Sequence, residues 1–136
     1  MVHKPVPEPD ELTKPFWDAV DAGRLEVQRC VKCRHFNHPP VDICPRCHSM
    51  EHAFEQVSGT GKIYSFTITH DARQPAFTEI QPYPVAVIEL DEEPGLFMLT
   101  NIPGAEVEEV KTGLSVEVEF EELVPGRFIP QFHLHR

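Results

Sequence analysis

The residues of this 136-residue chain whose types and spacing most clearly suit a chemical role are its four cysteines. They form two C-x-x-C pairs, Cys30 with Cys33 and Cys44 with Cys47, which ten residues separate. Each pair suits a tight turn that directs two thiolates at one ion, and two such turns complete the closed tetrahedral shell of structural zinc. The gap is shorter than the usual spacing of about 15–20 residues, but it is long enough for a small hairpin. The sequence therefore predicts one structural zinc ion bound by all four cysteines.

Three other uses of the cysteines fit the pattern less well. Disulfides need an oxidising compartment, and nothing in the sequence indicates export. A redox C-x-x-C would leave the second pair redundant, and no βαβ pattern surrounds either pair. Iron in a rubredoxin-like site is the nearer alternative, but Arg34 and His48 stand where such iron sites usually have a glycine after the second cysteine. Zinc is therefore the favoured metal.

Histidines and basic residues surround the cysteine pairs. His35, His38 and His48 could each replace a cysteine as ligand, but four thiolates already complete the shell, so we expect these imidazoles at surface or supporting positions. Four thiolates around one zinc ion carry net negative charge, which nearby cations would offset. The cysteine region has five basic residues for this purpose, namely Arg24, Arg29, Lys32, Arg34 and Arg46.

The acidic residues concentrate in the second half of the chain. The whole chain has 22 acidic and 12 basic residues, and residues 89–122 hold eleven acids against Lys111 alone. Solvated surface carboxylates are the commoner cause of such a run. A C-terminal half that is this acidic repels the phosphate backbones of nucleic acids, which argues against nucleic acid as the main ligand.

Length and composition indicate one ordinary domain, or two very small ones that share an interface. A hydrophobic fraction of 40% is enough for a core, while 14 prolines and seven glycines favour short strands joined by turns. No apolar run approaches the roughly 20 residues that a membrane span needs, and the N-terminus lacks the apolar stretch of a secretory signal. We therefore expect a cytoplasmic protein without a membrane partner.

A short helix is predicted before the first cysteine. Residues 1–12 form a proline-rich, flexible lead, and residues 13–23 hold the helix, with Thr13 as its cap, Pro15 in its first turn and Gly23 as its stop. So short a helix must pack its apolar face on the domain or on a partner. This face consists of Phe16, Trp17, Ala19 and Val20.

The rest of the chain has the pattern of short strands. Residues 24–53 lead into the first cysteine pair and return through the stiff turn at 38–41, as a zinc ribbon does, and residues 54–136 form the OB-fold. The clearest alternation is at 114–121, with apolar residues inward and glutamates outward. About five strands with glycine-bearing bends predict a small barrel, which removes exposed sheet edges. The expected fold is mainly β: a short N-terminal helix, a rubredoxin-like zinc ribbon and a five-stranded OB-type barrel.

Several short motifs follow one another in a distinctive order from about Pro15 to the end of the chain. They are Pro15-Phe16-Trp17, Gly23-Arg24-Leu25, Gln28-Arg29-Cys30, His38-Pro39-Pro40, Cys44-Pro45-Arg46-Cys47, the stretch from Ser58-Gly59-Thr60-Gly61 to Ser65, Tyr83 to Leu90, Thr100-Asn101 and Gly113. Their order resembles a family of acyl-CoA-associated proteins that combine a short helix, a zinc ribbon and an OB-fold. No single motif beyond the cysteine pairs is diagnostic.

The resemblance implies a non-catalytic accessory subunit that binds and activates a thiolase-like enzyme acting on acyl-CoA. Some members accompany enoyl-CoA hydratases. In one branch the complex with a thiolase-like protein is an aldolase, which cleaves a β-hydroxyacyl-CoA side chain during steroid degradation. The loop at 70–77 and the short length favour that branch. The implied assembly is a hetero-oligomer that shares acyl-CoA with its partner.

The chain offers weak candidates for chemistry of its own. His70 and Asp71 stand at a predicted strand end, near Tyr83, but neighbouring residues in a strand point in opposite directions, so no catalytic residue is predicted. His133 and His135 are expected at the surface. Coenzyme A carries phosphates, and the basic ribbon is the region best able to attract it. The residues expected to contact CoA or the partner are Trp17, Arg29, Lys32, Arg34 and Arg46.

Two functions of other classes compete with the accessory role. OB-folds and zinc ribbons also serve as nucleic-acid-binding modules, but these need a basic groove with exposed aromatic residues, and the barrel half is acidic. A small iron redox protein would be red and would show a reversible potential.

Overall fold

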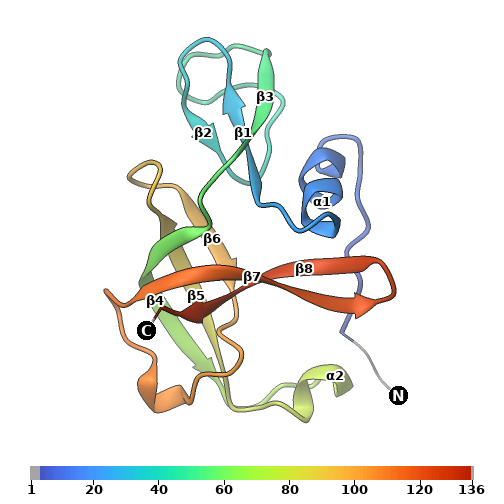
Figure 1. Ribbon diagram of the computed structural model, residues 1–136, viewed down its shortest axis with the longest axis vertical. Coiled ribbons are helices and arrows are strands. Elements are labelled where there is room, and N and C mark those ends of the chain that lie inside the picture. Colours follow the sequence, from blue (N-terminus) through green and yellow to red (C-terminus); the bar gives the residue numbers. More distant parts are fainter. Residues whose placement is uncertain (1–3, 136) are drawn as a thin grey trace.

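The computed structural model describes residues 4–135. It contains two antiparallel sheets, with strand orders β2-β1-β3 and β6-β5-β4-β7-β8. Figure 1 shows the small sheet at one end of an elongated molecule, the larger sheet curled into a barrel at the other, and helix α1 beside their junction. The predicted fold class, a mainly β chain with a short helix, a zinc ribbon and a five-stranded barrel, is confirmed.

Helix α1 spans Lys14–Asp21 and ends where the sequence predicts, but at its start the side chain of another residue accepts an N–H. Gly23 has φ +80° and its N–H donates to the Val20 carbonyl, so it ends the helix. At the start, Asp10 Oδ1 accepts the Thr13 N–H at 2.8 Å, and Thr13 Oγ1 accepts the Asp10 N–H at 3.1 Å. Thr13 thus stands at the N-cap position, as predicted, but its side chain makes no capping hydrogen bond. Its backbone N–H, and then its hydroxyl, hold the pKa of the Asp10 carboxyl below its usual value.

The segment before α1, expected as a flexible lead, has no helix or strand at 4–10 but contacts the barrel. Lys4 Nζ lies 3.0 Å from a carboxylate oxygen of Glu121. The Arg127 guanidinium donates to the Pro7 carbonyl at 2.9 Å. These two contacts hold the segment against the last hairpin, and residues 1–3 of the expected lead lie outside the described residues.

The ribbon sheet consists of β1 (Glu26–Cys30), β2 (Phe36–Asn37) and β3 (His52–Gln56). Strand β3 pairs with β1 from Glu26↔Gln56 to Cys30↔His52. The pattern at 54–57, which the sequence assigns to the barrel half, therefore pairs with the ribbon. The alternation of side chains indicates that a short segment is a strand, but it does not indicate with which neighbouring strand the segment pairs.

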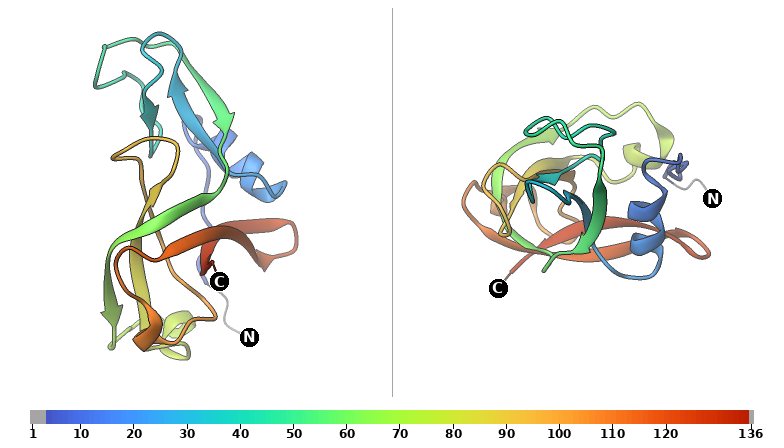
Figure 2. Two further views of the ribbon diagram at one scale, coloured as in Figure 1. Left: turned by 60° about the vertical axis from the view of Figure 1, so that its left-hand side comes forward. Right: turned by 90° about the horizontal axis from the view of Figure 1, so that it is seen from above.

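The barrel consists of β4 (Thr60–Thr69), β5 (Tyr83–Leu90), β6 (Phe97–Thr100), β7 (Ser115–Val124) and β8 (Arg127–Leu134). A short helix α2 (Pro75–Thr78) lies in the long loop after β4, and a 3-10 turn (Val107–Glu109) precedes β7. Both views in Figure 2 show α1 beside the β7–β8 hairpin. Helix α1 therefore meets the barrel on the side of its last strand.

The barrel is nearly closed where the two edge strands approach each other. The Phe132 N–H donates to the Asn101 carbonyl at 3.4 Å. Beside this bond, the buried Gln131 Oε1 accepts the Asn101 N–H at 3.0 Å and the Thr100 hydroxyl at 3.1 Å. One buried amide thus satisfies the backbone where the barrel seam closes.

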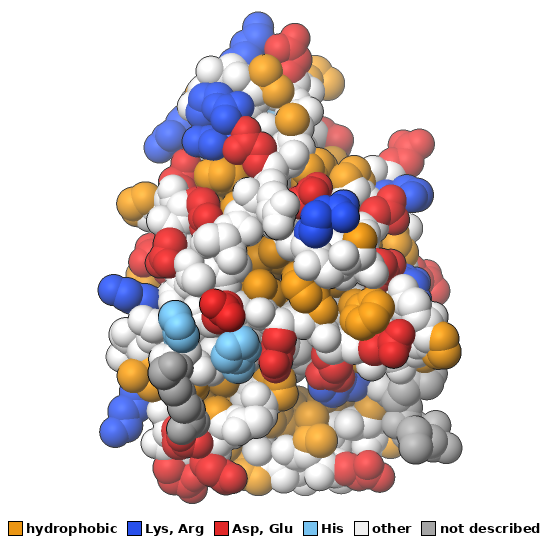
Figure 3. Space-filling view, viewed as in Figure 1, with side chains coloured by type: hydrophobic (Ala, Val, Ile, Leu, Met, Phe, Trp, Pro, Cys, Tyr) orange, Lys and Arg blue, Asp and Glu red, His pale blue; other side chains and the backbone are white. Residues whose placement is uncertain are grey.

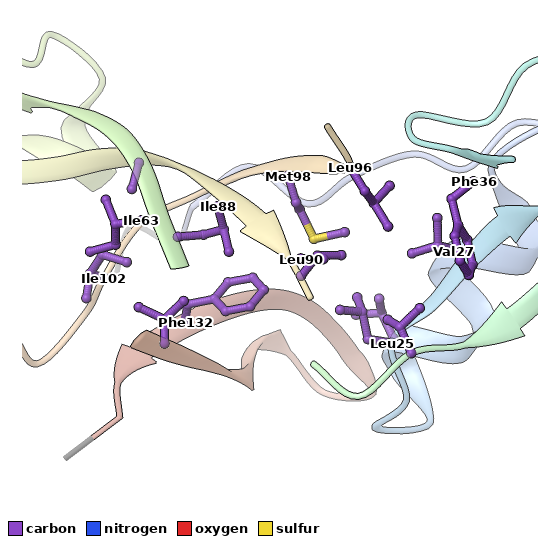
Figure 4. Close-up of a cluster of buried hydrophobic side chains, with 14 of the residues drawn as sticks. Leu25, Val27, Phe36, Ile63, Ile88, Leu90, Leu96, Met98, Ile102 and Phe132 are labelled. Atoms are coloured by element: carbon purple, nitrogen blue, oxygen red, sulfur yellow. The ribbon is translucent and has the colours of Figure 1, made fainter. Parts of the chain in front are cut away.

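A single hydrophobic core runs from the ribbon into the barrel. Figure 4 shows Leu25, Val27 and Phe36 of the ribbon half beside Leu90 and Leu96 of the barrel half, and the chain of contacts continues toward Phe132. Val27 is 0% exposed and Leu90 is 1% exposed. Because these side chains belong to one cluster, moving the ribbon relative to the barrel would expose core surface. The ribbon therefore has a fixed orientation on the barrel.

Candidate metal centre and docking groove

The four cysteine sulfurs meet at the far end of the ribbon. All four Sγ atoms lie within 4.8 Å of one another, with Cys30 Sγ 3.5 Å from Cys47 Sγ and Cys33 Sγ 3.6 Å from Cys44 Sγ. A tetrahedral zinc site with Zn–S bonds of about 2.3 Å has sulfurs about 3.8 Å apart, so the donor set fits zinc. Among residues 4–135, no other group of three or more His, Cys, Asp or Glu side chains meets this geometry. The predicted four-cysteine structural zinc site is confirmed.

The two cysteine turns repeat the same backbone geometry. The Arg34 N–H donates to the Cys30 carbonyl at 3.0 Å, and the His48 N–H donates to the Cys44 carbonyl at 2.8 Å. Arg34 has φ +66° and His48 has φ +67°, the left-handed conformation that glycine most easily adopts. Both turns thus take the usual metal-knuckle shape although neither has the glycine.

The ionisation of the thiols also depends on a central cation. The Cys33 N–H helps to lower the pKa of Cys30. Burial opposes ionisation of Cys44, but the N–H groups of Cys47 and Arg46 outweigh it and lower that pKa to about 6. The His35 N–H favours the Cys33 thiolate, yet burial and the other three sulfurs raise its pKa to about 12. Four thiolates this close repel one another, so a divalent ion is needed for all four to ionise.

The basic residues predicted to contact CoA or a partner do not form one surface. Arg29 Nη1 and Arg34 Nη2 both pair with the Glu55 carboxylate, at 2.9 and 2.6 Å, and together these pairs lower the pKa of Glu55. Arg29 also stacks over the Phe36 ring at 4.3 Å. Lys32 and Arg46 are exposed, and no carboxylate lies within ion-pair distance of them in the described chain. Basic side chains gather over the ribbon in Figure 3.

The histidines near the cysteines take supporting positions. His35 Nδ1 lies 2.8 Å from Glu93 Oε2, which links the ribbon to the turn between β5 and β6. His38 stacks against Phe16 of α1, with ring centroids 5.2 Å apart. Burial lowers the pKa of His38 to about 4, so its ring is neutral at pH 7. His48 is exposed.

An apolar groove of about 660 Å³ lies where helix, ribbon and barrel meet. Its walls are the start of α1 with Trp17, the turn at 38–40, residues 97–99 of β6 and residues 129–131 of β8. Gln28 holds the turn in place, because its side-chain amide makes two hydrogen bonds of 2.9 Å with the backbone of Val41. Of the predicted contact residues, Trp17 alone lies in this groove. No local pattern of residues marks the barrel side of this groove, because side chains from separate strands meet there.

The weak catalytic candidates do not converge. His70 and Asp71 are exposed, and Asp71 lies 3.9 Å from Arg73 in an equally exposed pair. Tyr83 stacks on Phe77, with ring centroids 5.7 Å apart. None of these three candidates lines the groove.

His133 and His135 lie near the end of β8. His133 Nδ1 is 3.5 Å from Glu119 and Nε2 is 3.8 Å from Glu117, both on the neighbouring strand β7. His135 is exposed. Within residues 4–135, no helix combines the length and apolar character that a membrane crossing requires.

Comparisons with known proteins identify both halves of the chain. Residues 17–52 match the family model described as the ChsH2 rubredoxin-like zinc ribbon domain, and residues 54–121 match the ChsH2 C-terminal OB-fold domain. The solved structure named Ltp2-ChsH2(DUF35) aldolase contains a chain that superposes with a TM-score of 0.85 at 32% identity, over 94% of this chain and 98% of that one.

Two curated relatives are longer proteins. The probable enoyl-CoA hydratase alpha subunit of Thermomonospora curvata is 36% identical over 118 residues, which are 86% of this chain and 36% of the relative. The 3-oxo-4,17-pregnadiene-20-carboxyl-CoA hydratase alpha subunit of Mycobacterium tuberculosis is 31% identical over 121 residues, 83% of this chain and 37% of the relative. This chain thus spans about a third of the length of these relatives. With both domain matches, the four-sulfur centre and the near-complete superposition in place, the chain belongs to the ChsH2 family of zinc-ribbon and OB-fold proteins.

Proposed function

We propose that this chain is a non-catalytic accessory subunit that binds and activates a thiolase-like enzyme acting on an acyl-CoA. The observation that carries the proposal is its correspondence with 98% of the ChsH2(DUF35) chain in a structure named as an aldolase. The site chemistry supports it. A four-thiolate zinc site has no open position for substrate, and the candidate catalytic side chains His70, Asp71 and Tyr83 do not meet in a pocket.

The reaction that we propose for the complex is an aldolase cleavage of a β-hydroxyacyl-CoA with a steroid side chain. One relative is named for a pregnadiene carboxyl-CoA, and the aligned structure is named an aldolase. Such an enzyme must hold a CoA thioester, whose phosphates need cations. Lys32 and Arg46 supply exposed cations on the ribbon, whereas Arg29 and Arg34 hold Glu55. We therefore assign CoA attraction to the first two residues and a structural role to the second two.

The test is co-expression with the thiolase-like protein encoded nearest to this chain. Light scattering during size-exclusion chromatography measures complex formation, and release of the shortened acyl-CoA measures cleavage. We expect a hetero-oligomer that cleaves the substrate, and no cleavage by this chain alone. Turnover by the isolated chain, or the absence of a complex, would contradict the proposal.

The CoA assignment has a separate test in that complex. Lys32→Glu with Arg46→Glu should raise the KM for acyl-CoA by roughly tenfold, because each exposed charge contributes up to about 1 kcal/mol. Lys111→Glu is the matched control, since it makes the same kind of charge change at an exposed site on the barrel half. Equal KM values for the double variant and the control would reject the assignment.

A further inference from the structure

The two edge strands of the five-stranded sheet differ in how their outward backbone groups are hydrogen-bonded. On β8, the backbone groups that face away from β7 belong to Phe128, Pro130, Phe132 and Leu134, since His135 donates toward β7 and the direction alternates along the strand. The Phe128 N–H donates to Asp21 at 2.9 Å, Pro130 has no N–H, and the Phe132 N–H donates to Asn101. From Phe128 to Phe132 the edge of β8 thus has no free N–H for another strand.

The edge of β6 is open. The Leu96 carbonyl accepts the Leu90 N–H, so Leu96 and the alternate residues Met98 and Thr100 direct their backbone groups toward β5. Phe97 and Leu99 therefore direct theirs away from β5, and no group in residues 4–135 is within hydrogen-bonding distance of them. The Leu99 side chain is 70% exposed. An open edge with an exposed apolar side chain is a template for another strand.

This open edge borders the groove. Strand β8 meets the end of β6 at Thr100 and Asn101, where the seam closes, and residues 97–99 of β6 line the groove beyond that point. The groove wall contains no Lys, Arg, Asp or Glu, and its one titratable residue, His38, is neutral because of its burial. The four residues of β6 extend about 13 Å at the rise of an antiparallel strand. The space thus suits a short extended segment that is uncharged along this length.

The acids of the turn between β5 and β6 do not face the open edge. The Thr60 hydroxyl donates to Asp91 Oδ2 at 2.6 Å, and the Ser58 N–H donates to Glu92 Oε2 at 2.7 Å. Both donors lie at the start of β4, which pairs with β5 on the side away from β6. These acids therefore set no charge requirement on a segment that pairs with β6.

We propose that an extended segment of the partner enzyme adds a strand to β6, with its apolar side chains in the groove beside Trp17. This inference rests on the proposed accessory function and names how the partner is held. Main-chain hydrogen bonds to Phe97 and Leu99 provide the affinity, and the apolar groove selects the side chains.

Other occupants satisfy the site less completely. A small apolar ligand fills the groove but leaves the backbone groups of Phe97 and Leu99 unpaired. A second copy of this chain brings the same net charge of -10, which opposes self-association. A strand from another protein meets the backbone groups and the uncharged wall together.

The experiment compares Leu99→Pro with Leu99→Ala in binding to the co-expressed thiolase-like partner. Proline removes the outward N–H and leaves the bonds to β5 intact, because the Leu99 N–H faces away from β5. We expect Leu99→Pro to weaken the complex at least tenfold, and Leu99→Ala to weaken it less. In the wild-type chain, hydrogen exchange of the Phe97 and Leu99 amides should slow at least tenfold in the complex. The exchange measurement decides the question even if Leu99→Pro fails to fold.

A probe that does not depend on the partner separates the two proposals. It is an eight-residue peptide of alternating valine and threonine, with two lysines at one end for solubility, titrated into the isotope-labelled chain. Selective shifts and slowed exchange at Phe97 and Leu99 support strand addition even if no thiolase-like complex forms. Strand addition is wrong, while the accessory role stands, if the complex forms with unchanged exchange at both amides. It is also wrong if a fatty acyl probe binds in place of the peptide, or if these amides are protected by dimerisation of the chain alone.

Discussion

The carboxylate of Asp21, at the end of helix α1, accepts the backbone N–H of Phe128, the second residue of strand β8, at 2.9 Å. Its other oxygen accepts Arg127 Nε at 3.1 Å. The two residues are 107 positions apart in the chain. One side chain thus fixes the helix on the barrel and occupies an edge donor of β8, which leaves β6 as the edge strand that borders the groove with unpaired backbone groups.

Asp21→Ala should lower the free energy of unfolding by about 1–3 kcal/mol, because it leaves the Phe128 N–H without its partner. Asp21→Asn keeps an oxygen that accepts this N–H and loses only the charge opposite Arg127, so its loss should be about 1 kcal/mol or less. Urea denaturation at fixed zinc concentration measures both. Equal losses for the two variants would show that the backbone hydrogen bond adds no stability.

Cys44→Ser should abolish tight zinc binding and unfold the ribbon, since metal binding and folding are coupled in such small modules. The metal content of the purified chain should fall from one zinc ion per chain to a small fraction. His48→Ala is the control, because His48 is exposed and is not a ligand, so it should keep its zinc. A Cys44→Ser chain that still formed a stable, active complex would show that the metal site is dispensable.

Stability should fall between pH 6.5 and pH 4 through His38. Burial lowers its folded-state pKa from 6.5 to about 4, so in this window the unfolded chain binds a proton that the folded chain does not. The stability is complete above pH 6.5 and is lost as the pH falls through the folded pKa, by about 3 kcal/mol in total. His38→Phe keeps a ring against Phe16 and removes the titration. The wild type should lose more stability than this variant over the window, and parallel curves would contradict the assignment.

Gly61→Ala should destabilise the barrel by about 3 kcal/mol. A Cβ at this position would collide with the Glu89 carbonyl oxygen and the Ile88 side chain on the paired strand β5. Gly113→Asn is the control, since a side chain there meets open space and asparagine tolerates its positive φ. Its effect should stay below about 1 kcal/mol. Thermal unfolding of both variants with zinc present measures the difference.

Local patterns in the sequence predicted the parts of the fold that depend on neighbouring residues. The alternation around Val116 and Val118 gave strand β7, the spacing of the cysteines gave the metal site, and Gly23 gave the end of α1. Each of these signals acts over a few residues. The order and the types of the side chains are therefore sufficient to reveal these local signals.

The features that the sequence did not predict depend on contacts between distant residues. The Asp10 side chain, and not that of Thr13, accepts an N–H at the start of α1, because the Thr13 hydroxyl bonds back to Asp10. Glu55 takes up Arg29 and Arg34 across the ribbon sheet, so a basic cluster in the sequence becomes two free cations in space. The groove forms where separate strands, the helix and a turn meet, and no local pattern marks it.

The contact between Asp21 and Phe128 also sets an order of events while the chain is being synthesised. All four cysteines lie within the first 47 residues, so metal can load before the barrel strands leave the ribosome. Helix α1 can meet the ribbon early, since Phe16 stacks on His38, but its contact with β8 must wait until that strand has emerged, about 80 residues later. During that interval the side of α1 that packs on β8 stays open to other hydrophobic surfaces in the cell. After early metal binding, the docking of helix α1 on β8 and the closing of the barrel seam are thus the last steps of folding.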